Sequence, residues 1–182
     1  MTETTINWQP TSLEDNLVKL VPITQHDFDA IYEVAADPLI WEQHPKRDRY
    51  KKEVFRDFFD GAVSSGTAFL IRDKSSDKVI GSTRYYDYKP VDSSIAIGFT
   101  FLARQCWGGL YNKSSKKLLL DYAFQFVDKV YFHIGATNIR SQLATTKIGA
   151  TKVNEVLIDH QGEKILHYEY LVQKENWEKK RD

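Results

Sequence analysis

The stretch Arg104-Gln105-Cys106-Trp107-Gly108-Gly109-Leu110-Tyr111-Asn112 decides the fold of this chain. It lies between an apolar, strand-like segment at 95–102 and a helix-like segment at 112–127. Two adjacent glycines before a helix let the backbone approach an anion, and the helix dipole favours negative charge there. The sequence therefore predicts a phosphate-binding loop at a strand-to-helix junction. The alternative is an ordinary turn, because glycine pairs are common in such loops.

Bulk properties restrict the class of protein. A length of 182 residues predicts one domain with a substantial core. The 25 basic and 25 acidic residues balance, which gives no electrostatic footprint for nucleic acid. The chain has no long apolar run or signal-peptide pattern, so no membrane partner is expected. A single cysteine excludes an intramolecular disulfide and predicts a reducing, cytoplasmic setting.

That cysteine, Cys106, lies inside the glycine loop. A helix N-terminus lowers the pKa of a nearby thiol, which keeps a nucleophilic role open as an alternative. The sequence places no histidine or acid beside it to complete such a site. The aromatic content of 13% favours large buried rings or an aromatic-lined pocket.

Hydrophobic periodicity gives the order β-α-α-β-β-β-α-β-α-β-β, which indicates an α/β or α+β domain around one largely antiparallel sheet. Thr24 is the expected N-cap of the first helix, with Asp27 as its capping-box acid. We expect an N-terminal arm at 1–16 with Trp8 as an anchor, one domain at 17–177 and a charged tail at 178–182. The expected strands are 17–23, 67–72, 78–86, 94–102, 130–134, 151–159 and 163–172, and the expected helices are 24–37, 52–64, 112–127 and 138–148.

With these motifs in this order, the chain resembles the GCN5-related N-acetyltransferase (GNAT) family, and within it the ribosomal-protein N-terminal acetyltransferases of RimJ/RimL type. The resemblance runs from about Leu17 to Trp177. It rests on Val18-Lys19-Leu20-Val21-Pro22, Ala36-Asp37-Pro38-Leu39-Ile40-Trp41, Val79-Ile80-Gly81-Ser82-Thr83-Arg84-Tyr85, Ile97-Gly98-Phe99-Thr100, Trp107-Gly108-Gly109-Leu110-Tyr111-Asn112, Asn138-Ile139-Arg140-Ser141 and Ile148-Gly149-Ala150.

The resemblance implies a twisted, mostly antiparallel sheet of about seven strands with about four helices and splayed central strands. It implies acetyl-CoA as cosubstrate, no metal, and direct attack of a primary amine in a ternary complex. The amine would belong to a protein N-terminus or to a small molecule. Relatives often form dimers, so a homodimer is an expectation.

The resemblance also assigns the cofactor contacts. The free backbone of the central strand would pair with the pantetheine arm, as an added strand does. The loop N–H groups would hold the pyrophosphate. Asn138 would bind the arm, Ser141 would protonate the leaving thiolate, and Lys147 would reach a phosphate. The expected cofactor-binding residues are Phe99, Thr100, Phe101, Gln105, Cys106, Trp107, Gly108, Gly109, Leu110, Tyr111, Asn112, Asn138, Ser141 and Lys147.

Two positions depart from the family pattern. Leu110 stands where glycine or alanine is usual, and Ala96 stands where many relatives carry a glutamate base. Because amines are mostly protonated at neutral pH, another group must take the proton. Glu42 and His44 are the expected catalytic candidates, with Ser141. The expected acceptor-binding residues are Trp41, Arg84, Tyr85 and Tyr86.

These departures keep two further classes open. One is a domain that binds or senses acyl-CoA without catalysis. The other is an interaction domain that has the fold but no longer binds the cofactor.

Overall fold

The computed structural model describes residues 5–160 and 162–179. In this part of the chain, eight strands form one sheet in the order β1-β2-β3-β4-β5-β6-β8-β7. Neighbouring strands run antiparallel except β5 and β6, which are parallel. This confirms the expected mixed, mostly antiparallel sheet. The strands are β1 (Leu13–Glu14), β2 (Val18–Pro22), β3 (Ala68–Asp73), β4 (Val79–Lys89), β5 (Ser94–Leu102), β6 (Lys129–Gly135), β7 (Thr151–His160) and β8 (Glu163–Gln173).

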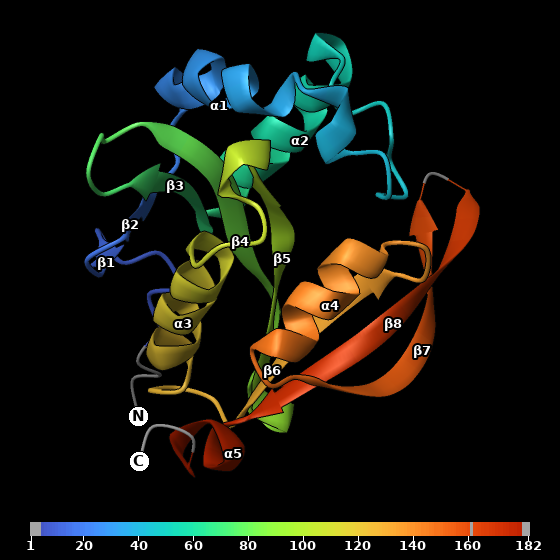
Figure 1. Cartoon of the computed structure of the whole chain (residues 1–182). Coiled ribbons are helices and arrows are strands. Elements are labelled where there is room, and N and C mark those ends of the chain that lie inside the picture. Colours follow the sequence, from blue (N-terminus) through green and yellow to red (C-terminus); the bar gives the residue numbers. More distant parts are fainter. Residues whose placement is uncertain (1–4, 161, 180–182) are drawn as a thin grey trace.

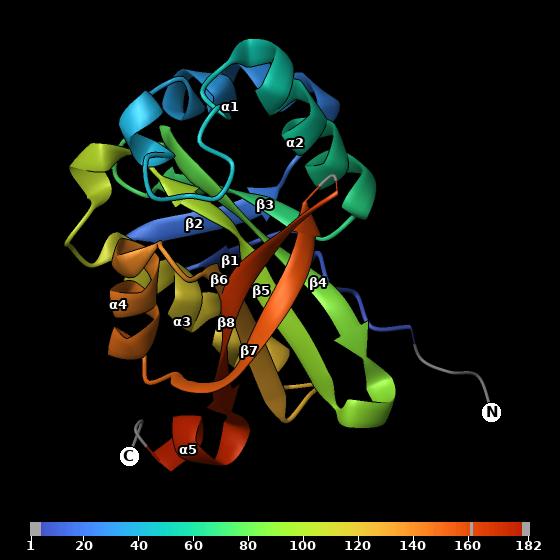
Figure 2. The same ribbon diagram turned by 90° about the vertical axis from the view of Figure 1, so that its right-hand side faces the viewer.

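The helices lie on both faces of this sheet. Helices α3 and α4 cover one face, and α1 and α2 pack at the other (Figures 1 and 2). Helix α3 ends at Ala123 rather than at the expected Val127. Strand β1 and helix α5 are additional to the expected elements. The helices are α1 (Phe28–Ala35), α2 (Lys52–Ser65), α3 (Tyr111–Ala123), α4 (Ile139–Lys147) and α5 (Lys174–Lys179).

Residues in the expected N-terminal arm contribute to the core. The Trp8 side chain is 8% exposed, and its ring centroid lies 5.3 Å from that of Tyr85. Strand β1 pairs with β2 at the edge of the sheet. Residues 1–4 of the arm, 180–182 of the expected tail and Gln161 of the last hairpin lie outside the described residues.

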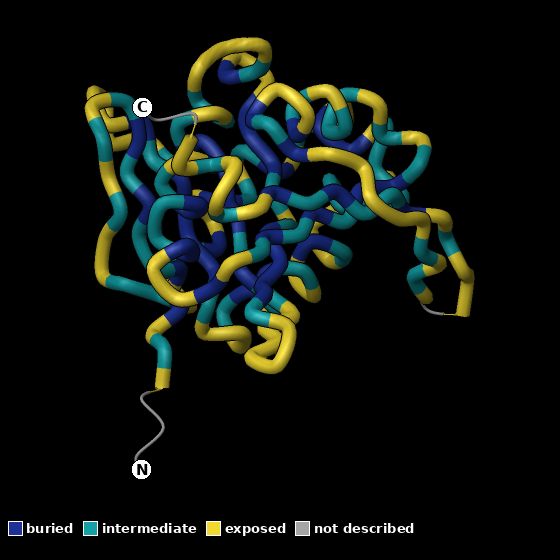
Figure 3. The backbone as a smooth tube through the Cα atoms, turned by 90° about the horizontal axis from the view of Figure 1, so that it is seen from below, coloured by how far each residue is buried: buried dark blue, intermediate teal, exposed yellow. Residues whose placement is uncertain are grey.

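Two clusters of buried side chains stabilise the two faces. One packs α3 against the sheet, and the other packs α1 and α2 against β3 and Phe101. The buried segments run through the middle of the molecule, whereas the β7–β8 hairpin is largely exposed toward its tip (Figure 3). Each face of the sheet therefore has its own hydrophobic support, which fixes the strands between them.

Local signals in the sequence set the helix boundaries. The Asp27 carboxylate accepts hydrogen bonds of 2.7 Å from both the backbone N–H and the hydroxyl of Thr24, as a capping-box acid does. Thr24 caps a 3-10 turn at Gln25–Asp27, and α1 itself begins at Phe28 with Asp27 as its N-cap. Gly66 ends α2 with a φ of 62°, in the left-handed region that favours glycine.

The central strands separate part of the way along their length. Strands β5 and β6 pair only from Ser94 to Ala96, opposite Lys129 to Tyr131. Beyond this point Phe99 has a φ of 51°, and the β4–β5 register shifts opposite it. Such a bulge bends a strand and disrupts its ladder. The expected splay is therefore present, and the backbone of 97–102 has no β6 partner among the described residues.

No helix in the described residues is both long enough and apolar enough to span a membrane.

Candidate functional site

The glycine loop joins the splayed end of β5 to the first turn of α3. The N–H groups of Cys106 and Trp107 donate to Ala103 and Arg104 carbonyls at 2.8 and 3.0 Å, so a short turn already uses them. Gly108 has a φ of 70°. An added Cβ at Gly108 or at Gly109 would meet no atom within 4 Å. The space beside both glycines is open, and the α3 N-terminus that follows has unpaired N–H groups.

Leu110 does not close this space. Its side chain is 67% exposed, and the residue is the N-cap of α3. The side chain therefore points to solvent rather than into the core. Gln105 is also exposed, while Tyr111 is half-buried and its hydroxyl donates to Asp73 at 3.0 Å.

The expectation of a lowered pKa at Cys106 is wrong. Its side chain is 6% exposed, and burial raises the pKa of the thiol. Desolvation disfavours the thiolate and outweighs the nearby helix N-terminus. Cys106 packs in the core between the sheet and α3, so its thiol is directed away from the loop surface.

Arg140 connects the glycine loop to the segment between α1 and α2. Its guanidinium lies 3.8 Å from the Trp107 ring centroid and pairs with Glu42 at 3.3 Å. It also donates to the Ile40 carbonyl at 3.0 Å. The Trp107 indole in turn donates to the Leu102 carbonyl at 2.9 Å. No local sequence signal predicts this bridge, because its partners are distant along the chain.

Asn138 and Ser141 occupy the first turn of α4. The Asn138 side-chain oxygen accepts the Ser141 N–H at 3.2 Å, so Asn138 caps the helix. Among the described residues, none accepts a hydrogen bond from its side-chain amide nitrogen. Lys147 is exposed at the other end of α4. The cap and a ligand contact can therefore coexist at Asn138.

His44 lies in an environment unsuited to the expected base. Burial, with Arg49 nearby, lowers its pKa to about 3. Its Nδ1 atom accepts the Lys46 N–H at 2.9 Å. An imidazole whose pKa is this low is a weak base and takes up a proton poorly near neutral pH. Trp41 differs from its expected role too: it is 2% exposed, and its indole donates to the Ala35 carbonyl at 2.8 Å, so it supports the core.

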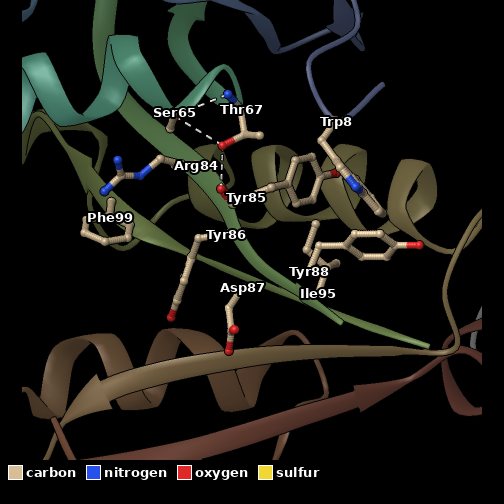
Figure 4. A pocket seen from close by; sticks show the side chains of 10 residues that line it. All are labelled: Trp8, Ser65, Thr67, Arg84, Tyr85, Tyr86, Asp87, Tyr88, Ile95 and Phe99. Atoms are coloured by element: carbon tan, nitrogen blue, oxygen red, sulfur yellow. Dashed lines mark hydrogen bonds between the residues drawn. The ribbon is translucent and has the colours of Figure 1, made fainter. Parts of the chain in front are cut away.

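Alternation along β4 separates the three predicted acceptor residues. Tyr85 is fully buried, and its hydroxyl donates to the Leu119 carbonyl under α3. It also borders the pocket beside this strand, so its contact with the acceptor stays a prediction. Arg84 and Tyr86 lie on the other face. Together with Tyr85 and Phe99 they line a pocket of about 400 Å³ (Figure 4). The Arg84 guanidinium lies 3.5 Å from the Phe99 ring centroid.

A second arginine reinforces the positive charge near this pocket. Arg49 lies 4.6 Å from the Phe58 ring centroid, and the Phe58 and Phe99 rings are 6.1 Å apart. Burial, and then the charge of Arg84, lower the pKa of Arg49 to about 10. In the described residues neither arginine forms an ion pair. Two guanidinium groups stacked on adjacent rings without a carboxylate would favour an anionic ligand group.

Lys116 is a buried charge that the sequence analysis missed. It lies on α3 and is 5% exposed. Its Nζ atom donates to the Thr100 hydroxyl at 2.5 Å, and the Thr83 hydroxyl is 3.4 Å away. Desolvation lowers the pKa of this amine to about 7. Its helical spacing with Leu119 and Leu120 was the available signal, because it places Lys116 on the apolar face of α3.

Comparison with known proteins identifies the family to which this chain belongs. Residues 18–151 match the family described as Acetyltransferase (GNAT) domain. No curated protein sequence matches the chain. The class is thus an acetyltransferase-type domain with splayed central strands. Because the match covers most of the chain, the protein belongs to the GNAT acetyltransferase family.

Solved structures show the same fold at low identity. A GCN5-related N-acetyltransferase from Brucella melitensis has 18% identity and a TM-score of 0.78, covering 92% of this chain and 80% of its own. Spermidine N-acetyltransferase from Vibrio cholerae, in complex with CoA and spermine, has 12% identity and a TM-score of 0.68, with 90% and 99% covered. Mycobacterium smegmatis RimJ, with CoA-disulfide, has 15% identity and a TM-score of 0.65, with 87% and 82% covered.

No group of three or more histidine, cysteine or acidic side chains within 5–160 and 162–179 is arranged to hold a metal ion.

Gly108→Val tests the loop. The added side chain would occupy the open space beside the loop N–H groups, so we expect acetyl-CoA to bind at least about tenfold more weakly by calorimetry. Gly66→Val is the matched control, because Gly66 has a similar φ of 62° and equal open space but ends α2. Equal acetyl-CoA affinity in both folded variants would place the phosphate site elsewhere.

Lys116→Met tests the buried amine through its pH dependence. Between about pH 7 and the ordinary lysine pKa, the unfolded chain holds a proton that the folded protein has lost. Unfolding free energy of the wild type should therefore rise with pH, by up to about 1.4 kcal/mol per unit. The variant should be more stable than the wild type at pH 6, and the difference in their unfolding free energies should be smaller at pH 10. Urea unfolding at pH 6 and pH 10 measures this difference, and the same difference at both pH values would contradict the prediction.

Proposed function

We propose that this protein is an acetyl-CoA-dependent N-acetyltransferase that transfers the acetyl group to a primary amine by direct attack in a ternary complex. The observation that carries the proposal is the separation of β5 from β6 beyond Ala96, leading directly into the open glycine loop. The free backbone groups of the strand suit the pantetheine arm of CoA, and the loop beside it suits the pyrophosphate. Binding donor and amine together would supply much of the rate enhancement.

The donor would lie along β5 and over the α3 N-terminus. The backbone of Phe99 to Phe101 would pair with pantetheine, and the N–H groups from Gly108 to Asn112 would hold the pyrophosphate. Asn138 would donate its free amide to the arm. Ser141 would protonate the leaving thiolate, and Lys147 would reach a phosphate. The exposed Leu110 side chain supports this arrangement, because it leaves the cradle open.

The solved relatives supply independent support for CoA. The Vibrio cholerae and Mycobacterium smegmatis proteins were solved with CoA and CoA-disulfide. The RimJ neighbour is consistent with the RimJ/RimL-like subgroup that the sequence suggests. The unpaired Cys106 supports a reducing, cytoplasmic setting.

Charge near the pocket favours one kind of acceptor. Arg84 and Arg49 would bind the carboxylate of an amino acid or short peptide that carries the reacting amine, as arginine forks do. Their positive charge would also lower the pKa of a bound ammonium group and increase its neutral, nucleophilic fraction. We therefore propose an amino acid or peptide N-terminus as acceptor rather than a polyamine.

A panel of matched amines tests this function. We expect micromolar binding of acetyl-CoA by calorimetry and CoA release with alanyl-alanine, measured with a thiol reagent. Alanyl-alaninamide has the same amine but no carboxylate, and it should show a KM at least about tenfold higher. Arg84→Gln should remove this difference between the two dipeptides. Butylamine and spermidine complete the panel.

The same measurements separate the alternatives. Donor binding without transfer to any amine would favour an acyl-CoA sensor. Absence of binding to acetyl-CoA and to CoA would favour an interaction domain.

Ser141→Ala isolates the proposed acid. Loss of the hydroxyl should lower kcat by roughly tenfold or more, because the thiolate leaves without a proton. Affinity for acetyl-CoA should stay within about twofold, since the Asn138 cap accepts a backbone N–H that alanine retains. Unchanged kcat would remove Ser141 from the mechanism. Thr146→Ala, on the exposed surface of the same helix, is the control.

A further inference from the structure

Three side chains form a hydrogen-bonded chain across the splayed strands. The Tyr86 hydroxyl on β4 lies 2.7 Å from Nδ1 of His133 on β6. The Nε2 atom of His133 lies 2.8 Å from the Glu169 carboxylate on β8. The His133 and Glu169 side chains are 14% and 20% exposed. A tyrosine, a histidine and a glutamate from three strands are therefore connected in a partly solvent-shielded line.

For a neutral His133 ring, the chemistry of the three groups sets the direction of both hydrogen bonds. An ionised carboxylate only accepts, so Nε2–H of His133 donates to Glu169. In the neutral ring Nδ1 is then the acceptor, and the Tyr86 hydroxyl donates to it. The phenolic oxygen of Tyr86 retains its lone pairs. The outer end of the chain therefore offers an acceptor to an incoming N–H group.

The path of Tyr86 depends on a glycine in β5. A Cβ at Gly98 would lie 2.8 Å from Cε1 of Tyr86, closer than real Cβ contacts allow. The Tyr86 and Phe99 ring centroids are 5.2 Å apart. Figure 4 shows Tyr86 beside Phe99 at the pocket, with its hydroxyl directed toward β6. The hydroxyl therefore reaches across β5 beside the bulge, where the strands separate and the thioester would lie.

We propose that Tyr86 is the catalytic residue that accepts the proton of the attacking amine, and that His133 and Glu169 are positioning residues that receive this proton and stabilise it. The inference rests on the proposed function and names the proton acceptor that Ala96 cannot supply. The N–H bond of the amine breaks as an O–H bond forms at Tyr86. The original O–H bond of Tyr86 breaks as Nδ1 of His133 gains that proton. The imidazolium is balanced by Glu169, as in a triad.

The environment of Tyr86 favours a phenol that passes a proton on to His133 over a phenolate that exists before the reaction. Burial, followed by the nearby charge of Asp87, raises the pKa of its hydroxyl. The group therefore stays a phenol, and one proton leaves as the other arrives. The other titratable and charged groups around this chain are Arg84, Asp87 and Lys89 on β4, Tyr131 on β6, His167 on β8 and Arg49 in the segment after α1.

Tyr86→Phe removes the relay and keeps the ring. With alanyl-alanine, or the panel amine that reacts fastest, we expect kcat/KM to fall roughly 100-fold at pH 7. Affinity for acetyl-CoA should be unchanged. The deficit in kcat/KM should shrink to below about tenfold at pH 9, because hydroxide is more abundant there and can take the proton in place of the relay. A purely structural role would give the same deficit at both pH values.

Glu169→Gln and His133→Gln test the inner positions. Both should lower kcat at pH 7 with unchanged KM for acetyl-CoA. Tyr131→Phe is the matched control, since Tyr131 lies on the same strand and face as His133 and should retain activity within about twofold. If Tyr86→Phe reacts like the wild type at pH 7, the relay is wrong while the acetyltransferase function stands.

The hydrogen-bond direction can be checked without any acceptor. Long-range proton–nitrogen NMR spectra of the whole protein should show His133 with its proton on Nε2. The Glu169→Gln variant should shift the His133 nitrogens, and Tyr131→Phe should leave them in place. A proton on Nδ1 in the wild type would overturn the relay, even if the protein transfers no acetyl group.

Discussion

The separation of β5 from β6 is the constraint on which the rest of the structure depends. Pairing stops at Ala96, and the bulge at Phe99 turns the strand away from its neighbour. On its β6 side the backbone of 97–102 has no ladder partner, and only the β4 ladder and side-chain packing hold it. Core clusters on both faces of the sheet supply that support. The Thr83, Thr100 and Lys116 side chains fix the bulge from the α3 side.

Around this opening, the protein carries several charges at low solvent exposure. Lys116, Arg49 and Arg84 all have pKa values lowered by desolvation. In the described residues none of them has an acidic partner within ion-pair distance. Burying unpaired charge is costly, so it persists where function or a bound anion compensates. The proposed acceptor carboxylate would be such a compensating group, and the family's transfer chemistry needs the neutral amine that this field favours.

Much of the fold was predictable because local signals and global topology agree. The Thr24–Asp27 cap is present at the turn that leads into α1, Gly66 ends α2, and the alternation of apolar residues locates the longer strands. Strand β1 was not predicted because two residues carry no periodicity. Helix α5 was not predicted because all of its residues are polar apart from the half-buried Trp177. The sequence did not reveal that Trp41 and Tyr85 pack in the core, since an aromatic ring in sequence looks the same whether it lines a cleft or packs in a core.

The sequence by itself determined the family, the order of elements and the glycine loop, because these depend on contiguous residues with fixed local geometry. Only the tertiary structure decided which side chains meet at the opening. Tyr86, His133 and Glu169 lie on three strands, and they come together through the sheet order β4-β5-β6-β8. The same folding left His44 half-buried and buried Cys106, reversing the pKa expectation for the thiol. Desolvation and contacts between distant segments arise only when the chain packs, so no local motif encodes them.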